Sequence, residues 1–531
     1  MLVTYYRCHF LYFLLACAGA SLLLLHIEAK HSGLTWVDSF FMCVSAMSGT
    51  GLAVVSLYRF TLASQLCIML LLFTGGQTFM ALPPLLLRRL WFRQAHSVEK
   101  VTFLSELCLW RPVRMKAQEQ AAEQLREYRA LGRLTVIIFC YLICSLVIGA
   151  TLLYFLSQPT LRRNPLPVDP LLFACFTTVA AFNNAGLTLL SNNLVLFAKD
   201  RGVLLVICWL IVGGQTGIPF ALRFILWALR GVTRNKQARE DLDFLWHHPR
   251  QCSTHLFPSY ETALLLATWV TFTSGEFALF VLTNAVGKFP GFSKSDEWLV
   301  GFFQSVSTRT AGFNAVDIGQ TSTGMLVVWV FMMFVAVYPF ELTLRTSASI
   351  KLRQDAQRRS LVLEYAPVQV VSVAELAAAG DHQMLTPARR LMALCLKDTS
   401  IIYMCVLVIT LADNQMLHHN QLFAVLFEVI SAYGTVGLSI SDTNLALSAS
   451  LSTFSKLVLC FVMLLGRHRG LPSHFDSSVT RIDAPPPVGA LKPGVFLGGV
   501  TGADEGTPLL RRRHTDTLTD RMRRDIGGFF Q

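Results

Sequence analysis

The sequence predicts an all-α membrane protein in which four pseudo-symmetric repeats, each a helix, a pore loop and a second helix, surround a central pore. Three observations lead to this fold class. Only 15% of the 531 residues are charged and 53% are hydrophobic, whereas soluble domains carry about 25% charged residues. Apolar runs of about 20 residues, long enough to span a membrane, recur along the chain. A short glycine motif recurs between these runs, and such a period indicates an internal repeat.

The four copies of the motif are similar in composition and regularly spaced. Each closes a short apolar segment on a glycine that precedes Leu or Phe, and the copies read SGTGL at 48–52, FNNAGLTL at 182–189, STRTAGFN at 307–314 and SAYGTVGLS at 431–439. The glycines follow one another at intervals of 135, 126 and 125 residues and are Gly51, Gly186, Gly312 and Gly437.

The first element expected in each repeat is a spanning helix. The apolar runs that open the four repeats are 10–28, 134–157, 261–286 and 391–412. The first run alone would also suit a cleaved signal peptide. We interpret it as a span because it occupies the position that opens the other three repeats.

The second element is a short helix that leads into the glycine motif. These segments begin at residues that favour helix starts, namely Asp38, Pro170 after Asp169, Glu297 and Asn420, and they cover 38–48, 170–182, 297–308 and 420–433. They are too short to cross about 30 Å of hydrocarbon, so the chain is expected to enter and return. Irregular backbone at membrane depth survives only where protein buries it or water reaches it. The glycine loops therefore line a water path or are packed away, and four similar loops favour the water path.

The third element is another long helix, at about 61–88, 202–230, 323–344 and 452–467. The total is eight spanning helices and four re-entrant pore helices. The domain boundaries that follow are repeats at 1–90, 133–231, 259–347 and 389–472, linkers at 91–132, 232–258 and 348–388, and a tail at 473–531. The tail is rich in Pro, Gly and Arg and is expected to be disordered.

Lys and Arg gather in the three linkers and in the tail. This pattern is typical of cytoplasmic loops, so we expect both termini in the cytoplasm and the glycine loops toward the outside. The net charge of +12 is explained in the same way, and nucleic-acid binding is not expected. The thirteen cysteines lie mostly in apolar runs, where Cys behaves as a small hydrophobe.

The repeated loops suggest ion binding. Several backbone carbonyls that point inward together can replace the water shell of a cation, and glycine lets the backbone aim them. Short helices whose C-terminal ends face the centre would favour a cation. The predicted ion-binding residues are the four glycines and the residues before them, namely Thr50, Gly51, Ala185, Gly186, Ala311, Gly312, Val436 and Gly437. We find no catalytic constellation, so an enzyme or a scaffold is disfavoured, and we expect no cofactor and no structural metal.

Longer stretches carry a resemblance to a known family. These are the four motifs together with TGGQTFMALPPLLLRR (74–89), GGQTGIPFALRFILWALRG (213–231), DFLWHHPRQCSTHLFPS (243–259), FFQSVSTRTAGFN (302–314) and GRHRGLP (466–472). They resemble the Trk/Ktr/HKT superfamily of cation transporters, and its fungal Trk branch most closely, over roughly residues 10 to 475. The resemblance implies potassium uptake across the plasma membrane, driven by the membrane potential, by a homodimer in which each subunit has its own pore.

The resemblance also implies that the four glycines contribute to a selectivity filter for K⁺. In the plant branch a serine at the first position accompanies sodium preference, so Gly51 favours potassium. A sodium transporter or a mixed sodium and potassium transporter of the same fold remains the alternative. Bacterial members have a glycine-rich gate in the third repeat, but FVAVYPFELTL (334–344) has none. They also need a nucleotide-binding regulatory subunit, which the fungal-like match argues against.

Charged and amide side chains near the loops are predicted to support or gate the pore. A bare positive charge would repel a cation, so we expect Arg309 behind the filter, paired with Glu428 or Asp317. Asn183 and Asn184 are expected to hydrogen-bond the second loop. Arg467 is expected below the filter, with snorkelling to the cytoplasmic interface as the alternative. Glu341 either faces the pore or lies in water at the end of a span, and Glu276 is expected to face outward.

Overall fold

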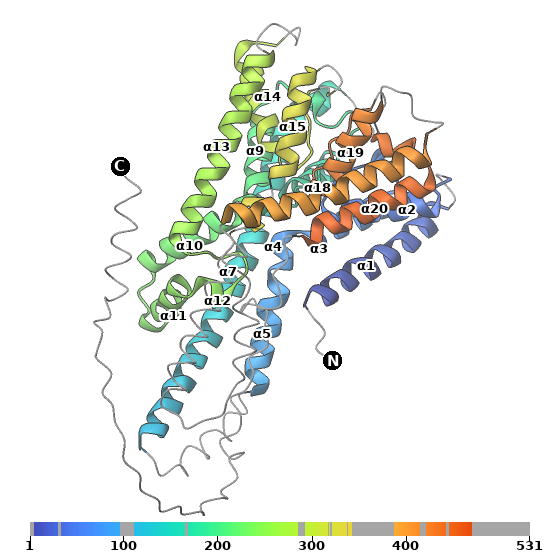
Figure 1. Ribbon diagram of the computed structural model, residues 1–531. Helices are drawn as coiled ribbons and strands as arrows, with labels where there is room; N and C mark the ends of the chain where they lie inside the picture. Colours follow the sequence, from blue (N-terminus) through green and yellow to red (C-terminus); the bar gives the residue numbers. More distant parts are fainter. Residues whose placement is uncertain are drawn as a thin grey trace, which may run out of the picture. The chain divides into compact units, whose positions relative to one another are not determined.

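The computed structural model describes residues 5–29, 33–95, 111–164, 168–284, 292–316, 318, 321–336, 338–341, 343, 387–414, 421–441 and 445–469. These residues form helices and connecting loops, and no strand occurs among them. The predicted all-α class is therefore confirmed (Figure 1). The linker segment before Pro387 and the predicted tail 473–531 lie outside the described residues.

The four opening helices are found where the apolar runs predicted them. They are α1 (Tyr5–Glu28), α7 (Arg111–Arg163), α13 (Ser259–Asn284) and α18 (Pro387–Ala412). Each contains a stretch long and apolar enough to cross a membrane. Helix α7 has 53 residues and begins inside the segment that the sequence predicts as a linker, 91–132. Much of that linker is therefore helical and continuous with the span.

The four short helices also match their predicted ranges. They are α2 (Trp36–Ser48), α8 (Pro170–Phe182), α14 (Lys294–Ser307) and α19 (Leu422–Gly434). Two of them begin earlier than expected because a hydroxyl caps them. The Thr35 Oγ1 accepts a hydrogen bond from the Asp38 backbone N–H and donates to the Asp38 carboxylate at 2.6 Å. Ser293 caps α14 in the same way through Asp296, at 2.7 Å. Each cap satisfies a backbone N–H that has no partner within the helix.

The closing helices of repeats 1 and 2 are broken. Repeat 1 has α3 (Leu62–Gly75), α4 (Gln77–Met80) and α5 (Leu82–Ala95), with a bend of 51° at the break after Gly75. Repeat 2 has α9 (Arg201–Ile211), the π-helical turn η3 (Val212–Thr216) and α10 (Ile218–Val232), with a bend of 89°. A span interrupted by glycines or a π turn is a common place for a kink.

Repeats 3 and 4 close with α15 (Thr323–Val335) and α20 (Thr453–His468). Among the described residues, five helices are long and apolar enough to cross a membrane, and each bent pair adds one candidate span. The eighth predicted span is α20, which has 16 residues and is shorter than a full crossing.

The repeats pack on one another in a cycle. Within each repeat the opening helix packs against both the short helix and the closing helix. Between repeats, the closing helix packs against the short helix of the next repeat, as α3 on α8, α9 on α14, α15 on α19 and α20 on α2. The last contact joins repeat 4 to repeat 1 and closes the ring, so the four short helices are held around one axis.

A smaller helical layer lies beside this ring. Helices α11 (Lys236–His247) and α12 (Pro249–Cys252) fold within the predicted linker 232–258 and pack against α7, which also lies side by side with α5 (Figure 1). Its apolar core is formed by residues that include Leu85, Leu131, Leu134, Leu242 and Leu245. The buried Arg88 side chain joins the helices by hydrogen bonds to the Glu127 carboxylate and the Gln251 carbonyl.

A buried carboxylate connects the end of α1 to the start of α3. The Glu28 side chain is 0% exposed and accepts hydrogen bonds from the Thr61 N–H and hydroxyl, both at 2.8 Å, and from the Ser64 hydroxyl at 2.6 Å. Glu28→Ala removes this acceptor and leaves three buried donors without it. We expect a loss of about 2 kcal/mol in stability, measured as a lower melting temperature in detergent. Glu240→Ala, at an exposed position of α11, is the control and should melt like the wild type.

Candidate functional site

The four motif glycines share an unusual backbone conformation. Their φ angles are +97° at Gly51, +61° at Gly186, +68° at Gly312 and +92° at Gly437. L-residues with a side chain rarely adopt positive φ, whereas glycine does so at little cost. The repeated glycines are therefore required first by the local backbone of each loop.

The four loops meet in a ring. A Cβ atom added to Gly51 would lie 1.9 Å from the Ala185 carbonyl oxygen, and one added to Gly186 would lie 2.5 Å from that of Ala311. The series continues from Gly312 to the Val436 oxygen at 1.9 Å and from Gly437 to the Thr50 oxygen at 2.1 Å. Each glycine thus faces the carbonyl that precedes the glycine of the next repeat, and the fourth returns to the first. The structure brings together all eight residues that the sequence predicts for ion binding.

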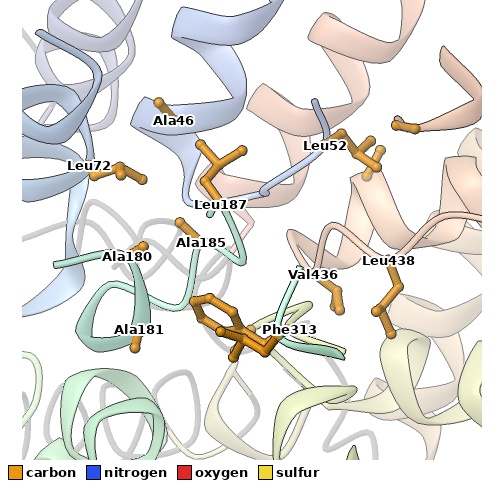
Figure 2. Packing of buried hydrophobic residues seen from close by; sticks show 14 of the residues in the cluster. Ala46, Leu52, Leu72, Ala180, Ala181, Ala185, Leu187, Phe313, Val436 and Leu438 are labelled. Carbon is orange, nitrogen blue, oxygen red and sulfur yellow. The ribbon is translucent and has the colours of Figure 1, made fainter. Parts of the chain in front are cut away.

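The residue after each glycine anchors its loop in the protein core. These residues are at most 2% exposed and are Leu52, Leu187, Phe313 and Leu438. Figure 2 shows them among the buried apolar side chains around the loops, together with Ala185 and Val436. In each loop a glycine faces the neighbouring loop and the apolar residue after it packs in the core, which explains why every motif reads Gly-Leu or Gly-Phe.

Hydrogen bonds to the short helices hold three loops in the same way. The N–H of the residue before the glycine donates to a helix carbonyl at 2.9 Å, as Thr50 to Ser45, Ala185 to Ala180 and Val436 to Ser431. In these repeats the residue two positions before the glycine is left-handed, and these residues are Gly49, Asn184 and Thr435. Repeat 3 has one residue fewer at this point, so there the glycine itself, Gly312, donates to Ser307 O at 3.1 Å.

Serine hydroxyls add a second tie in repeats 1, 3 and 4, and in repeat 3 the Ser307 Oγ donates to the Phe313 carbonyl at 2.7 Å. The Ser45 Oγ accepts from the Gly51 N–H at 3.1 Å and donates to the Leu52 carbonyl at 2.7 Å. The Ser431 Oγ accepts from the Gly437 N–H at 3.0 Å. These serines were not predicted, although Ser45, Ser307 and Ser431 stand at matching places near the C-terminal ends of three short helices.

A cavity of about 580 Å³ opens on one side of the ring. All four motif glycines line it, and so do polar residues that include Ser56, Thr188, Asn192, Asn314 and Ser439. None of the described residues that line it carries a charge. A hydrated ion can therefore reach the ring through a polar space.

A partly buried arginine binds the break in the closing helix of repeat 1. The Arg467 guanidinium, at the end of α20, donates to the Gly75 carbonyl, where α3 ends. Gly75 needs to be glycine because a Cβ there would lie 2.0 Å from the Met47 carbonyl oxygen at the end of α2. Arg467 therefore joins repeats 4 and 1 next to the end of a pore helix and does not extend freely from α20.

Arg309 does not have the partner expected from the sequence. It is 4% exposed, and its guanidinium lies near α13, 3.3 Å from the Thr273 hydroxyl and 3.5 Å from the Trp269 carbonyl. Glu276 of the same helix attracts it electrostatically, but within the described part of the chain both carboxylate oxygens of Glu276 have no hydrogen-bond partner. The predicted pairing with Glu428 is wrong, and Asp317 lies outside the described residues.

Glu276 was also expected to face outward, and this prediction was wrong. The side chain is 0% exposed and lies near Thr308 and Arg309, the two residues that precede the third loop's Thr310. Burial of a carboxylate costs free energy, and the attraction of the Arg309 guanidinium offsets part of that cost. An acidic residue within an apolar run indicates that a partner exists nearby, but the sequence did not identify Arg309 as that partner.

The other predicted support residues have these surroundings. Asn183 donates to the Val179 carbonyl in α8 at 3.0 Å, whereas the Asn184 side chain lies 2.9 Å from the Thr310 hydroxyl and so connects loops 2 and 3. Glu428 accepts from the Ser448 N–H at 3.0 Å and ties α19 to the turn η6 (Leu447–Ala449). Glu341 is 2% exposed, so the interpretation as a water-exposed residue at the end of a span is wrong.

A double-mutant cycle measures the buried pair. Removing one member, in Glu276→Gln or Arg309→Gln, leaves the other charge buried, and we expect each single variant to lose about 3 kcal/mol of stability. The double variant should lose less than the sum, with a coupling of at least about 1 kcal/mol. The readout is thermal unfolding in detergent. The exposed ion pair of Arg201 and Asp296, 2.9 Å apart, is the matched control and should show a smaller coupling, because water screens it. Equal coupling in the two cycles would contradict the assignment.

Comparison with known proteins places this geometry in a family. Residues 113–483 match the family model TrkH, described as a cation transport protein. The chain is 32% identical over 382 residues to the potassium transporter TRK1 of Candida albicans, covering 69% of this chain and 35% of that protein. It is 32% identical over 392 residues to the low-affinity potassium transport protein of Saccharomyces cerevisiae, covering 66% of this chain and 43% of that protein.

A solved structure has the same fold. The crystal structure of the potassium transporter TrkH from Vibrio parahaemolyticus aligns with a TM-score of 0.50 at 15% identity, over 87% of this chain and 82% of that one. The chain spans half or less of the length of the curated relatives that it matches first. The resemblance predicted from the motifs is confirmed: the chain belongs to the TrkH family of cation transport proteins.

Proposed function

We propose that this protein takes up potassium through a pore whose selectivity filter is formed by the ring of four glycine loops. The observation that carries the proposal is the cyclic contact of each glycine with the carbonyl before the next one. Four peptide carbonyls, those of Thr50, Ala185, Ala311 and Val436, surround one axis and can replace the hydration shell of a cation. The two positions in each loop thus have separate roles. The residue before the glycine provides the carbonyl oxygen, and the glycine, which has no side chain, leaves room for the carbonyl of the next loop.

Electrostatics support a cation. The four short helices all lead into the ring, so their partly negative C-terminal ends lie around it. The described walls of the cavity above the ring carry no charge that would repel or trap an ion. The positive charge of Arg309, three residues before the filter glycine Gly312, is attracted by the buried Glu276.

Potassium is the ion that we propose, for two reasons. Glycine stands at the filter position of all four repeats. Two relatives that are 32% identical over the aligned residues are named as potassium transport proteins. Potassium entry does not require ATP hydrolysis, because an inside-negative membrane potential contributes about 2.3 kcal/mol per charge per 100 mV.

The proposed setting follows the distribution of Lys and Arg. The protein lies in the plasma membrane with both termini in the cytoplasm, so the cavity above the ring faces outward. It assembles as a homodimer with one pore in each subunit. No nucleotide-binding subunit is required for transport, and Arg467 and Glu341 influence passage on the cytoplasmic side of the ring.

Transport and ion preference are tested together. The full chain is expressed in a yeast strain that lacks its potassium uptake systems, and growth is followed at micromolar potassium. Reversal potentials in mixed potassium and sodium solutions are then recorded from the same protein in a bilayer. Rescue of growth with a reversal potential that follows potassium supports the proposal. Sodium currents without rescue would assign sodium to the same pore and overturn the potassium assignment.

Gly312→Ser tests the filter directly. The new Cβ would lie 1.9 Å from the Val436 carbonyl oxygen at a φ of +68°, and the strain of such a residue is about 1–3 kcal/mol. We expect potassium uptake to fall by at least about tenfold, or the preference for potassium over sodium to be lost, at equal surface expression. Gly324→Ser is the matched control, because a Cβ at Gly324 meets nothing within 4 Å. Unchanged uptake together with unchanged selectivity in Gly312→Ser would contradict the filter assignment.

Arg467→Gln tests the positive charge below the ring. A fixed positive charge near the path raises the electrostatic barrier for a cation, so its removal is expected to increase the inward potassium current several-fold. Gln can still donate to the Gly75 carbonyl, and Arg467→Lys keeps the charge. The lysine variant should therefore conduct like the wild type. If both variants lose current equally, the side chain has a structural role only.

A further inference from the structure

A second cavity lies away from the pore, in the layer formed by α5, α7, α10 and α11. Its volume is about 580 Å³, and three arginines line it, namely Arg89, Arg129 and Arg133. Asp241 is the only acidic group among the described lining residues. The lining therefore carries a net positive charge, and the proposed transport function does not use it.

Asp241 binds two of the arginines but leaves part of each guanidinium group available for another acceptor. Its carboxylate is 0% exposed and accepts from the Nε atoms of Arg129, at 3.3 Å, and of Arg133, at 2.7 Å. Both hydrogen bonds start from Nε, so within the described part of the chain the Nη groups of each guanidinium are left for another acceptor. A guanidinium held in this way is suited to bind a phosphate through two parallel hydrogen bonds.

Arg89 is the third arginine, and an aromatic ring and a close helix backbone hold it. Its guanidinium lies over the Tyr128 ring, 5.0 Å from the centroid, and against the backbone of α7 at Gly132, where a Cβ would lie 3.1 Å from Arg89 Cζ. Its Nε is buried and has no hydrogen-bond partner among the described residues. A buried donor without an acceptor costs free energy, so the site is incomplete without an anion.

The cavity lies at the level where the apolar part of α7 begins. Arg133 is the last basic residue before the apolar run 134–157. The cavity wall continues into that run through Val136 and Ile137, with Leu229 from α10 opposite, and Val136 is 61% exposed. Nearby on α10, Trp227 is 62% exposed, as expected for an aromatic residue at a membrane interface. The cavity thus has a basic end and an apolar end that opens toward lipid.

We propose that this cavity binds the headgroup of an anionic phospholipid that carries a phosphomonoester, such as a phosphatidylinositol phosphate. The three arginines bind the phosphate, and the acyl chains lie along Val136, Ile137 and Leu229. A soluble phosphate would satisfy the arginines but would leave the apolar wall without a ligand. The assignment to the cytoplasmic leaflet rests on the proposed orientation, whereas the binding itself does not.

Binding to the purified full-length protein tests the site independently of transport. Binding isotherms are measured in detergent with dioctanoyl phosphatidylinositol phosphate and with dioctanoyl phosphatidylcholine, which lacks net charge. Arg89→Gln and Arg133→Gln should each weaken binding of the phosphoinositide by about tenfold. Arg239→Gln is the matched control, because Arg239 is exposed on α11 and does not line the cavity. It should bind like the wild type.

A charge-neutral variant separates a built site from general surface charge. Gly132→Val keeps every arginine but pushes the Arg89 guanidinium from its place, so it should weaken binding as Arg89→Gln does. Melting temperatures without lipid identify any variant that fails to fold, and Arg89→Gln is the variant that leaves both hydrogen bonds to the buried Asp241 in place.

Two results would overturn the proposal. Equal weakening in Arg239→Gln and in the cavity variants, or equal affinity for phosphatidylcholine, would show that no specific headgroup site exists here. Binding of inositol bisphosphate or inorganic phosphate as tight as that of the lipid would show that the cavity takes a soluble phosphate and not a membrane lipid.

Discussion

Close approach of one loop's main chain to the next is the constraint on which the rest of this structure depends. A side chain at any of the four motif glycines would occupy the position of a carbonyl group in the neighbouring loop. The same constraint acts one layer further out, where Gly75, Gly214 and Gly466 of the closing helices face the carbonyls of Met47, Phe182 and Tyr433 at the ends of the pore helices. Glycines thus permit close backbone contacts at two levels, between neighbouring loops and between closing helices and pore helices. The buried residue after each motif glycine packs in the core and holds its loop in position.

Much of the fold could be predicted because its signals are local. Apolar runs fix the spanning helices, and short runs that end on a repeated glycine fix the pore helices within two or three residues. The breaks in the closing helices could not be predicted in the same way. A Gly-Gly pair in an apolar run is compatible with a straight helix, and the bends at Gly76 and in η3 arise because the neighbouring pore helix approaches too closely for a regular turn. The helical start of α7 at Arg111 was missed because charge there suggested a loop.

The candidate site was predicted unevenly for a related reason. The glycines were found because they repeat, and the repetition supplies information that a single copy lacks. The interaction of Arg309 with Glu276 was not predicted. Glu276 lies more than thirty residues earlier on another helix, and a contact between two helices produces no periodic pattern in the sequence. Asn184 likewise bonds to Thr310 of the next repeat and not to its own loop. The ring is supported by contacts between repeats, and those contacts depend on the cyclic packing of the helices.

The third repeat differs from the others in one consistent way. Its loop is one residue shorter and lacks the left-handed residue that ends the pore helix in repeats 1, 2 and 4. Arg309 stands close to that point, and the buried Glu276 compensates its charge. The closing helix of this repeat also lacks the glycine pair or π turn that breaks its counterparts in repeats 1 and 2. Where the left-handed residue of the other repeats is absent, the Ser307 hydroxyl still donates to the Phe313 carbonyl at 2.7 Å, as the Ser45 hydroxyl does to the Leu52 carbonyl in repeat 1. Because the attraction between a buried carboxylate and a buried guanidinium weakens when water enters, the support that Glu276 gives to Arg309 depends on a dry surrounding.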